Sequence, residues 1–497
     1  MIRHLLAGAA MLLALAAPPR LAGAGEVVEC FAQGRLGLCS EPVLQHVGFK
    51  SVVLQFVDPR DTDLGEGLSR LLWREILESI SDLAGAGVIL AYDRQGAIRS
   101  ALGDRDYQEF LAREYHAAAE RIAASLGVQM SIWGVVLPDG EDLYLQGFLT
   151  LHVQDAATWT SLSVGSAGGG TPGGRPFTAA IGPQRLNLAP RRASRQALFN
   201  RAWTTRCALS AGCPGGVELR AGASNDAPVV ARVPEGIALR GRDMVRQWLK
   251  VVRPDGGEAY INLYHVEMFP DRVTFAGRRA VNLRGSAGSG GTAVGRVDLD
   301  GTYPVLGAVR AARAEPWYRI SAGGREGWVA GRLVERRSYT FPAVHLVAGL
   351  YRYARGQFPL AAAELEAFLA DARDEDNVTQ SVARQFLAAS RVAGRAGPAA
   401  LAAALRDLDE AVELTPFDPA AYAMRALVNL GAHDVVATVA DIDRALALDR
   451  RDPEAQRLLA DVLATARGPG LRRLAPGRDV GPAERQLHRL GERYPSR

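Results

Sequence analysis

The 497-residue sequence predicts a multidomain protein: an N-terminal α/β layer domain, two small β-barrels and a C-terminal α-helical solenoid. Three observations lead to this prediction. Strand and helix patterns alternate over residues 40–160, an aromatic and glycine pattern occurs twice between residues 217 and 333, and a helical pattern recurs at a fixed period after residue 340. A chain of this length divides into several domains, because single cores rarely grow beyond ~250–300 residues.

Residues 1–24 have the layout of a secretory signal peptide. Arg3 and His4 precede an apolar run, which ends at Pro18-Pro19 and is followed by small residues at 22–24. The run is shorter than the ~20 apolar residues that a membrane-spanning helix needs. We therefore expect a periplasmic or secreted protein with no transmembrane segment after signal removal.

The four cysteines form two close pairs, Cys30 with Cys39 and Cys207 with Cys213. In an oxidising compartment each pair can close a disulfide, and we favour this local pairing, although four cysteines allow three connectivities. A zinc site would need further Cys or His residues at ligand spacing, which neither pair has. We expect disulfides here and no metal site.

Residues 25–185 form the predicted α/β domain, which includes a glycine-rich loop at 165–174. Apolar runs and amphipathic stripes predict a strand at 51–57, a helix at 65–80, a strand at 87–92, a helix at 107–126 and two strands around Pro138-Asp139-Gly140. The run VVLQFVDP, the helix start near Gly65 and the Ala-x-x-Leu-Gly at 123–127 resemble the N-terminal module of TolB-like envelope proteins. The glycine-rich loop lacks the Gly-Lys-Ser/Thr of a phosphate-binding loop.

Residues 186–214 join this domain to the barrels. The basic stretch RRASRQALFNRAW at 191–203 predicts a helix capped by Ser194, which leads into the second cysteine pair. Its arginines form either a solvated helix face or a contact with an anionic partner.

The two predicted barrels occupy residues 215–270 and 278–337. WLKV beginning at Trp248 aligns with WYRI beginning at Trp317, and a Gly-bearing turn followed by an aromatic-aliphatic pair completes each copy. Short alternating strands with glycine-rich turns at this spacing predict small closed barrels.

The motifs NLR, V-G-x-V, WYRI and GWV make the second copy similar to the bacterial SH3 domain. The first copy departs from the pattern where Tyr260 replaces the second tryptophan and Ala259 replaces the preceding glycine. The resemblance implies domains that hold peptidoglycan peptides or protein segments without catalysing a reaction. Our candidate binding residues are the hairpin aromatics Trp328, Tyr260, Trp317, Tyr318 and Trp248. Trp317 and Trp328 can instead fill the barrel cores, because an indole buries ~150–250 Å².

Residues 340–465 carry the helical period. Asp407, Ala411 and Pro419 recur as Asp441, Ala445 and Pro453, each 34 residues later. This period resembles the tetratricopeptide repeat (TPR), a helical hairpin whose stacked copies expose a surface that binds segments of other proteins. We count about three TPR-like hairpins and expect a protein partner, although the array can instead brace the barrels. A basic tail follows at 466–497, with a helix predicted at 482–492.

No motif of an active site is evident. The sequence has no Gly-x-Ser-x-Gly and no His-Glu-x-x-His, and His116 with Glu120 is read as a surface pair rather than a metal site. The acidic group from Asp58 to Glu66 misses the spacing of a calcium loop and is better explained as helix capping. We expect no catalytic residues, no metal and no cofactor. The net charge of +4 is too small to require a nucleic-acid partner.

These observations favour a non-enzymatic binding scaffold of the cell envelope. Its barrels would hold peptidoglycan or a protein segment, and its repeats would recruit a protein partner. The alternative is a cell-wall hydrolase, or a regulator of one, with its centre in the N-terminal α/β domain. A third hypothesis makes that domain a sensor or assembly piece and the barrels spacers.

Overall fold

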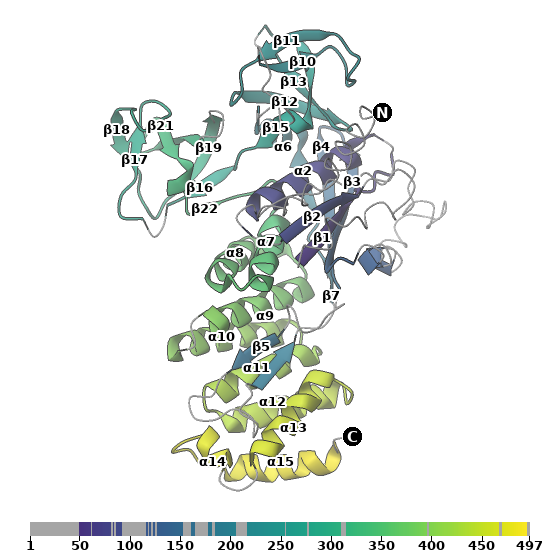
Figure 1. Cartoon of the computed structure of the whole chain (residues 1–497), viewed down its shortest axis with the longest axis vertical. Helices are drawn as coiled ribbons and strands as arrows, with labels where there is room; N and C mark the ends of the chain where they lie inside the picture. Colours follow the sequence, from purple (N-terminus) through teal and green to yellow (C-terminus); the bar gives the residue numbers. More distant parts are fainter. Residues whose placement is uncertain are drawn as a thin grey trace, which may run out of the picture.

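The computed structural model describes residues 49–60, 62–80, 83, 86–91, 116–117, 119–120, 123–124, 127–152, 161–164, 177–180, 184–204, 216–253, 255–275, 278–309, 315–394, 397–466 and 470–494. The predicted signal peptide, all four cysteines, the glycine-rich loop and most of the helix predicted at 107–126 lie outside these residues. Figure 1 shows β-rich parts at one end of the molecule and a column of helices that extends from them.

The N-terminal part is a six-stranded sheet in the order β2-β1-β3-β4-β7, with β8 also paired to β4. The strands are β1 (Phe49–Leu54), β2 (Ala86–Ala91), β3 (Met130–Asp139), β4 (Asp142–Leu151), β7 (Gln184–Asn187) and β8 (Arg191–Ser194). β1 lies parallel to β2 and β3, and the predicted hairpin is β3–β4, with Gly140 in the left-handed region at φ 60°.

Helix α2 (Leu64–Ser79) packs on this sheet through its apolar stripe, including Leu68, Leu72 and Ile76. The carboxylate of Asp58 accepts hydrogen bonds from the backbone N–H groups of Thr62 (2.8 Å) and Leu64 (3.1 Å). Asp58 therefore satisfies donors at the start of the helix, in agreement with the capping prediction.

The helix predicted at 191–203 is largely wrong. Residues 191–194 form β8 on the edge of β4, helix α6 is only Arg195–Phe199, and β9 (Ala202–Thr204) follows. Ser194 does cap α6, since its hydroxyl accepts from the N–H of Ala197 at 3.4 Å. Pairing with distant strands overrides the local helical preference of this stretch.

Two seven-stranded sheets follow, and they have the same strand order. In the first β-unit (residues 202–268) the order is β11-β10-β14-β13-β12-β9-β15, and in the second (residues 272–337) it is β18-β17-β21-β20-β19-β16-β22. The first comprises β9, β10 (Val217–Arg220), β11 (Val229–Val233), β12 (Ala238–Val245), β13 (Trp248–Val252), β14 (Glu258–Asn262) and β15 (Val266–Met268). The second comprises β16 (Arg272–Thr274), β17 (Asn282–Arg284), β18 (Ala293–Arg296), β19 (Thr302–Val309), β20 (Trp317–Ala322), β21 (Arg325–Ala330) and β22 (Arg336–Arg337).

The two β-units are attached differently. The core of the first is continuous with the N-terminal core, and Met244 packs so closely on α2 that Gly67 has no room for a side chain. The second has its own core, which includes Leu283, Ile320 and Val329 and which Trp203 of β9 joins. The first β-unit is therefore part of the N-terminal body, and the second is a separate module.

The C-terminal part consists of helices that pair as antiparallel hairpins. They are α7 (Ala343–Ala354), α8 (Phe358–Ala370), α9 (Asn377–Gly394), α10 (Pro398–Leu414), α11 (Pro419–Gly431), α12 (Val435–Leu448), α13 (Pro453–Ala466), α14 (Gly470–Leu474) and α15 (Gly481–Arg493). Helix α15 is the one predicted at 482–492. Among the described residues, no helix has both the length and the apolar character to cross a membrane.

The 34-residue period appears in the structure as recurring contacts. Arg391 pairs with Asp407 at 2.6 Å, and 34 residues later Arg425 pairs with Asp441 at 2.7 Å. Each pair joins the two helices of one hairpin. The recurrence shows that α9–α10 and α11–α12 are built alike.

Tyr351 and two short strands make contacts between the helices and the N-terminal part. Tyr351 of α7 is fully buried, and its hydroxyl donates towards Ser51 (2.5 Å) and the carbonyl of Gly87 (2.6 Å). The short strands β5 (Ser161–Val164) and β6 (Phe177–Ala180) leave the N-terminal part and pack against α9, α11 and α13 (Figure 1). Phe177 is fully buried there.

Candidate binding site

The outer face of the hairpin β20–β21 carries both tryptophans of the second β-unit. Trp317 and Trp328 are partly exposed, because successive residues of a strand point to opposite faces and both belong to the outward set. Trp328 lies between Arg284 on β17 and Arg319 on β20, its partners in the strand register. The result is a row in which one aromatic ring is flanked by two cationic residues.

The surroundings of Trp328 hold this row in shape. Arg284 donates to the carbonyl of Gly291 at 2.6 Å and so braces the loop between β17 and β18, while Arg319 lies 4.0 Å from Glu326. The hairpin turns at Gly323 and Gly324, which have φ of 57° and 74° and are exposed. The turn of the aromatic hairpin is therefore open to solvent, and Trp317 and Trp328 are partly exposed behind it.

The first β-unit repeats the arrangement with other side chains. Tyr260 lies between Arg220 and Lys250 in register, and Arg220 braces its own loop by donating to the carbonyls of Asn225 (2.7 Å) and Ala227 (2.8 Å). Lys250 pairs with Glu258 at 2.7 Å, as Arg319 pairs with Glu326 in the second β-unit.

The comparison with protein families decides what the second β-unit is. The family model described as "Bacterial SH3 domain" matches residues 279–335, which span β17 to η3 (Gly331–Leu333). Residues 279–335 are a bacterial SH3 domain. No curated protein matches the chain in sequence.

Solved structures with similarity to the chain are distant. NlpC2 from Trichomonas vaginalis is 12% identical over 27% of this chain and 47% of that one, with a TM-score of 0.15. NlpC1 from the same organism is 14% identical over 27% and 45%, with a TM-score of 0.14. TolB from Acinetobacter baumannii is 11% identical over 59% and 95%, with a TM-score of 0.13. The chain spans about half the length of the two NlpC proteins, and these scores assign no activity to it.

Two of the predicted binding aromatics are buried. Tyr318 is 3% exposed and stacks on Trp203 with ring centroids 6.4 Å apart, and Trp248 is 4% exposed. Tyr318 follows Trp317 in the strand and so points inward, whereas Trp248 is covered although its counterpart Trp317 is not. The outer faces therefore present Trp317, Trp328 and Tyr260, and the prediction of an open-face role for Tyr318 and Trp248 is corrected.

His116 and Glu120, which the sequence analysis read as a surface pair, are arranged differently in the structure. His116, read as a surface partner of Glu120, is 1% exposed and hydrogen-bonds Thr150 (2.8 Å) and Asn187 (3.1 Å). Burial lowers its pKa, and Glu120 pairs with Arg185 at 2.6 Å instead. Among the described residues, no cluster of His, Cys, Asp and Glu could hold a metal ion.

One further pair in the N-terminal sheet was not visible in the sequence. The hydroxyl of Ser131 lies 2.9 Å from Nε2 of His152, and burial lowers the pKa of His152 to about 4. A serine beside a neutral imidazole is a familiar nucleophile arrangement. Ser131 is fully buried, however, so no substrate reaches it and the pair is best explained as packing.

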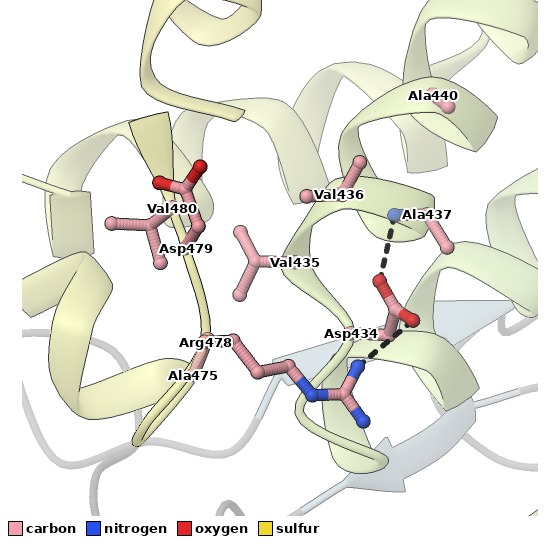
Figure 2. Close-up of a pocket in the computed structure, with 9 residues that line it drawn as sticks. All are labelled: Asp434, Val435, Val436, Ala437, Ala440, Ala475, Arg478, Asp479 and Val480. Carbon is pink, nitrogen blue, oxygen red and sulfur yellow. Dashed lines mark hydrogen bonds and ion pairs between the residues drawn. The ribbon is translucent and has the colours of Figure 1, made fainter. Parts of the chain in front are cut away.

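A cleft of about 440 Å³ lies near the C-terminal end of the helices (Figure 2). Valine and alanine side chains line it, together with Asp434, Arg478 and Asp479. Asp434 accepts from the N–H of Ala437 at 3.0 Å and pairs with Arg478 at 2.9 Å. This cleft is a joint between α12 and the segment before α15, without groups positioned for chemistry.

A second cavity, of about 220 Å³, lies between the N-terminal sheet, residues 340–343 and Glu375. Its walls are mostly apolar and include Phe56, Trp133 and Phe341. Glu375 accepts from the N–H of Ala189 at 2.5 Å and lies 3.9 Å from Arg191, and burial raises its pKa. Arg191 and Arg192, predicted either to form a solvated helix face or to contact an anionic partner, border this cavity.

Proposed function

We propose that the chain is a non-enzymatic binding scaffold of the cell envelope, periplasmic or secreted, whose SH3 domain holds peptidoglycan or a protein segment. The observation that carries the proposal is the open hairpin of residues 279–335, with Trp328 between Arg284 and Arg319. Bacterial SH3 domains are typical of envelope and secreted proteins. The absence of catalytic residues remains part of the proposal.

The chemistry of the row suits an anionic segment. An aromatic ring offers an apolar surface to aliphatic groups, and neighbouring guanidinium groups pair with carboxylates. Peptides of the cell wall and acidic protein segments both combine these features. A partly exposed tryptophan bordered by arginines has the composition of a binding hot spot.

We further propose that the first β-unit is a second SH3-like barrel. Its strand order is that of the SH3 domain, and its ladders bulge at equivalent places, between Leu219 and Arg220 and between Leu283 and Arg284. Among the aromatic residues of the first β-unit whose burial the structure describes, Tyr260 is the partly exposed one. We expect the first barrel to contribute less to binding, since a phenol replaces the indole.

The helices are proposed to be TPR-like repeats that recruit a protein partner. Support comes from the 34-residue recurrence of the Arg391–Asp407 pair as Arg425–Asp441. Strands β5 and β6 already occupy part of the layer formed by α9, α11 and α13. A partner that approaches this layer would therefore contact the β-pair as well as the helices.

Retention on purified peptidoglycan and on immobilised envelope extract tests the function. We expect Trp328→Ala to weaken retention by about 30-fold, the effect of losing a hot spot of ~2 kcal/mol. The melting temperature should change little, because Trp328 is partly exposed. Phe417→Ala is the matched control, since Phe417 is an aromatic residue 65% exposed on the helical part. Retention by neither matrix, or equal losses in both variants, would refute the proposal.

A further inference from the structure

A third cavity, of about 360 Å³, lies where the SH3 domain meets the end of α2 and the helices α7 and α8. We call it the junction cavity and define it by its polar lining: Glu78, Ser79, Tyr318, Glu335, Arg337, Tyr339, His345, Arg352 and Glu364. These side chains come from three separate parts of the chain. Tyr318, which the sequence marked as a binding residue and the structure turns away from the outer face, lines this cavity instead.

A carboxylate is held on the helical side of the cavity. Glu364 of α8 lies 2.7 Å from Nδ1 of His345 and 3.9 Å from Nε of Arg352. Arg352 is itself fixed, because it donates to the carbonyl of Ser79 (2.8 Å) and to Gln357 (2.7 Å). Glu364 is therefore a positioned negative charge at the cavity wall.

A cation, Arg337, also lines the cavity. Nε of Arg337 donates to the hydroxyl of Tyr339 at 3.3 Å, and its guanidinium lies 5.2 Å from the centre of that ring. Burial, reinforced by repulsion from Glu267, raises the pKa of Glu78 to about 8, while Arg337 and Arg74 oppose the rise. Glu78 lines the same cavity as Arg337.

The composition of the cavity is unusual for a joint between domains. Buried charges are costly, and apolar residues of similar volume usually make a contact at least as stable. Clusters of ionisable groups in a cavity occur more often at functional sites than elsewhere. The volume falls at the lower end of the ~300–1,000 Å³ typical of small-molecule sites, which suits a short peptide and excludes a folded partner.

We propose that the junction cavity binds a short zwitterionic peptide, with its carboxylate on Arg337 and its ammonium group on Glu364. The ring of Tyr339 would contact its aliphatic side chains. This site lies apart from the outer face that carries Trp328 and serves a soluble ligand rather than an immobilised wall. Because the walls come from three parts of the chain, the peptide would also tie the SH3 domain to α2 and α8.

Calorimetry on the full chain tests the site with trialanine as the probe. We expect trialanine to bind and both N-acetyl-trialanine and trialanine amide to bind at least tenfold more weakly, because each lacks one of the two charges. Equal binding of the free and blocked peptides, or no binding of trialanine at millimolar concentration, would overturn the proposal.

The variant Glu364→Gln sharpens the test, because it keeps the size of the side chain and removes its charge. In this variant trialanine should bind only as tightly as N-acetyl-trialanine binds the unaltered chain, and the affinity for N-acetyl-trialanine should not change. The reason is that the substitution and the acetylation remove the same interaction, between Glu364 and the ammonium group. Additive losses would contradict the assignment of the ammonium site. Tyr339→Phe supplies a second, milder variant, and Phe417→Ala should leave binding unchanged. A variant that loses peptide binding but keeps wall retention would assign peptide binding to the junction cavity. A variant that keeps peptide binding but loses wall retention would assign wall binding to the outer face that carries Trp328.

Discussion

Replacing Tyr351 with phenylalanine removes one oxygen atom from the contact between α7 and the N-terminal sheet. In the folded chain this hydroxyl lies 2.5 Å from the Ser51 hydroxyl and 2.6 Å from the carbonyl of Gly87, and its ring packs edge-on against Phe49 at 4.8 Å. The phenylalanine ring fills the same space, so the change deletes hydrogen bonds and little packing. Buried groups left without a partner cost ~1–3 kcal/mol in total.

Hydrogen exchange is the appropriate measurement, because a chain of several domains need not unfold in one step. A loss of ~1–3 kcal/mol predicts amide exchange about 5- to 150-fold faster in β1, β2 and α7, with little change in the SH3 domain. Tyr353→Phe is the matched control on the same helix. Tyr353 is also buried, and it contacts Phe358 and Phe386 through its ring. If both variants change exchange at the seam equally, the hydroxyl of Tyr351 does not join the two parts.

Two further predictions concern stability. Gly327→Ala should lower the stability of the SH3 domain by ~1–3 kcal/mol, because the added carbon would lie 2.5 Å from Leu283; a melting curve checks this, and an unchanged midpoint would contradict the packing described. Asp407 has a pKa raised by burial to about 6, so its folded form binds a proton more tightly than the unfolded chain, and stability should fall as pH rises from about 4 to 6. In Asp407→Asn the melting temperature should change less with pH over that range. If it changes as much as in the unaltered protein, other groups cause the pH dependence.

Local patterns predicted the elements that depend on neighbouring residues. The β3–β4 hairpin follows from alternation on both sides of Pro138-Asp139-Gly140, and α2 from apolar residues four apart. Helices α11 and α13 begin at Pro419 and Pro453, which recur at the 34-residue period, and the structure shows that Asp418 and Asp452 cap them.

Features that depend on docking were not predictable. Trp248 and Trp317 occupy equivalent places in similar motifs, yet Trp248 is buried and Trp317 is partly exposed. Nothing in the local sequence distinguishes them. The junction cavity was missed for the same reason, since Glu78 and Glu364 belong to helices far apart in the chain, and of its lining only Tyr318 belonged to a recognisable motif.

The β5–β6 pair has a consequence for how the chain folds. Phe177 precedes the helices that its strand contacts by more than two hundred residues, since α11 begins at Pro419 and α13 at Pro453. Contacts of such long sequence separation form late and slow folding. During synthesis, the two strands are made well before their docking surface. A truncated chain that ends before α11 would lack helices that β6 packs against and would leave Phe177 exposed. Exposed apolar side chains of this kind promote aggregation.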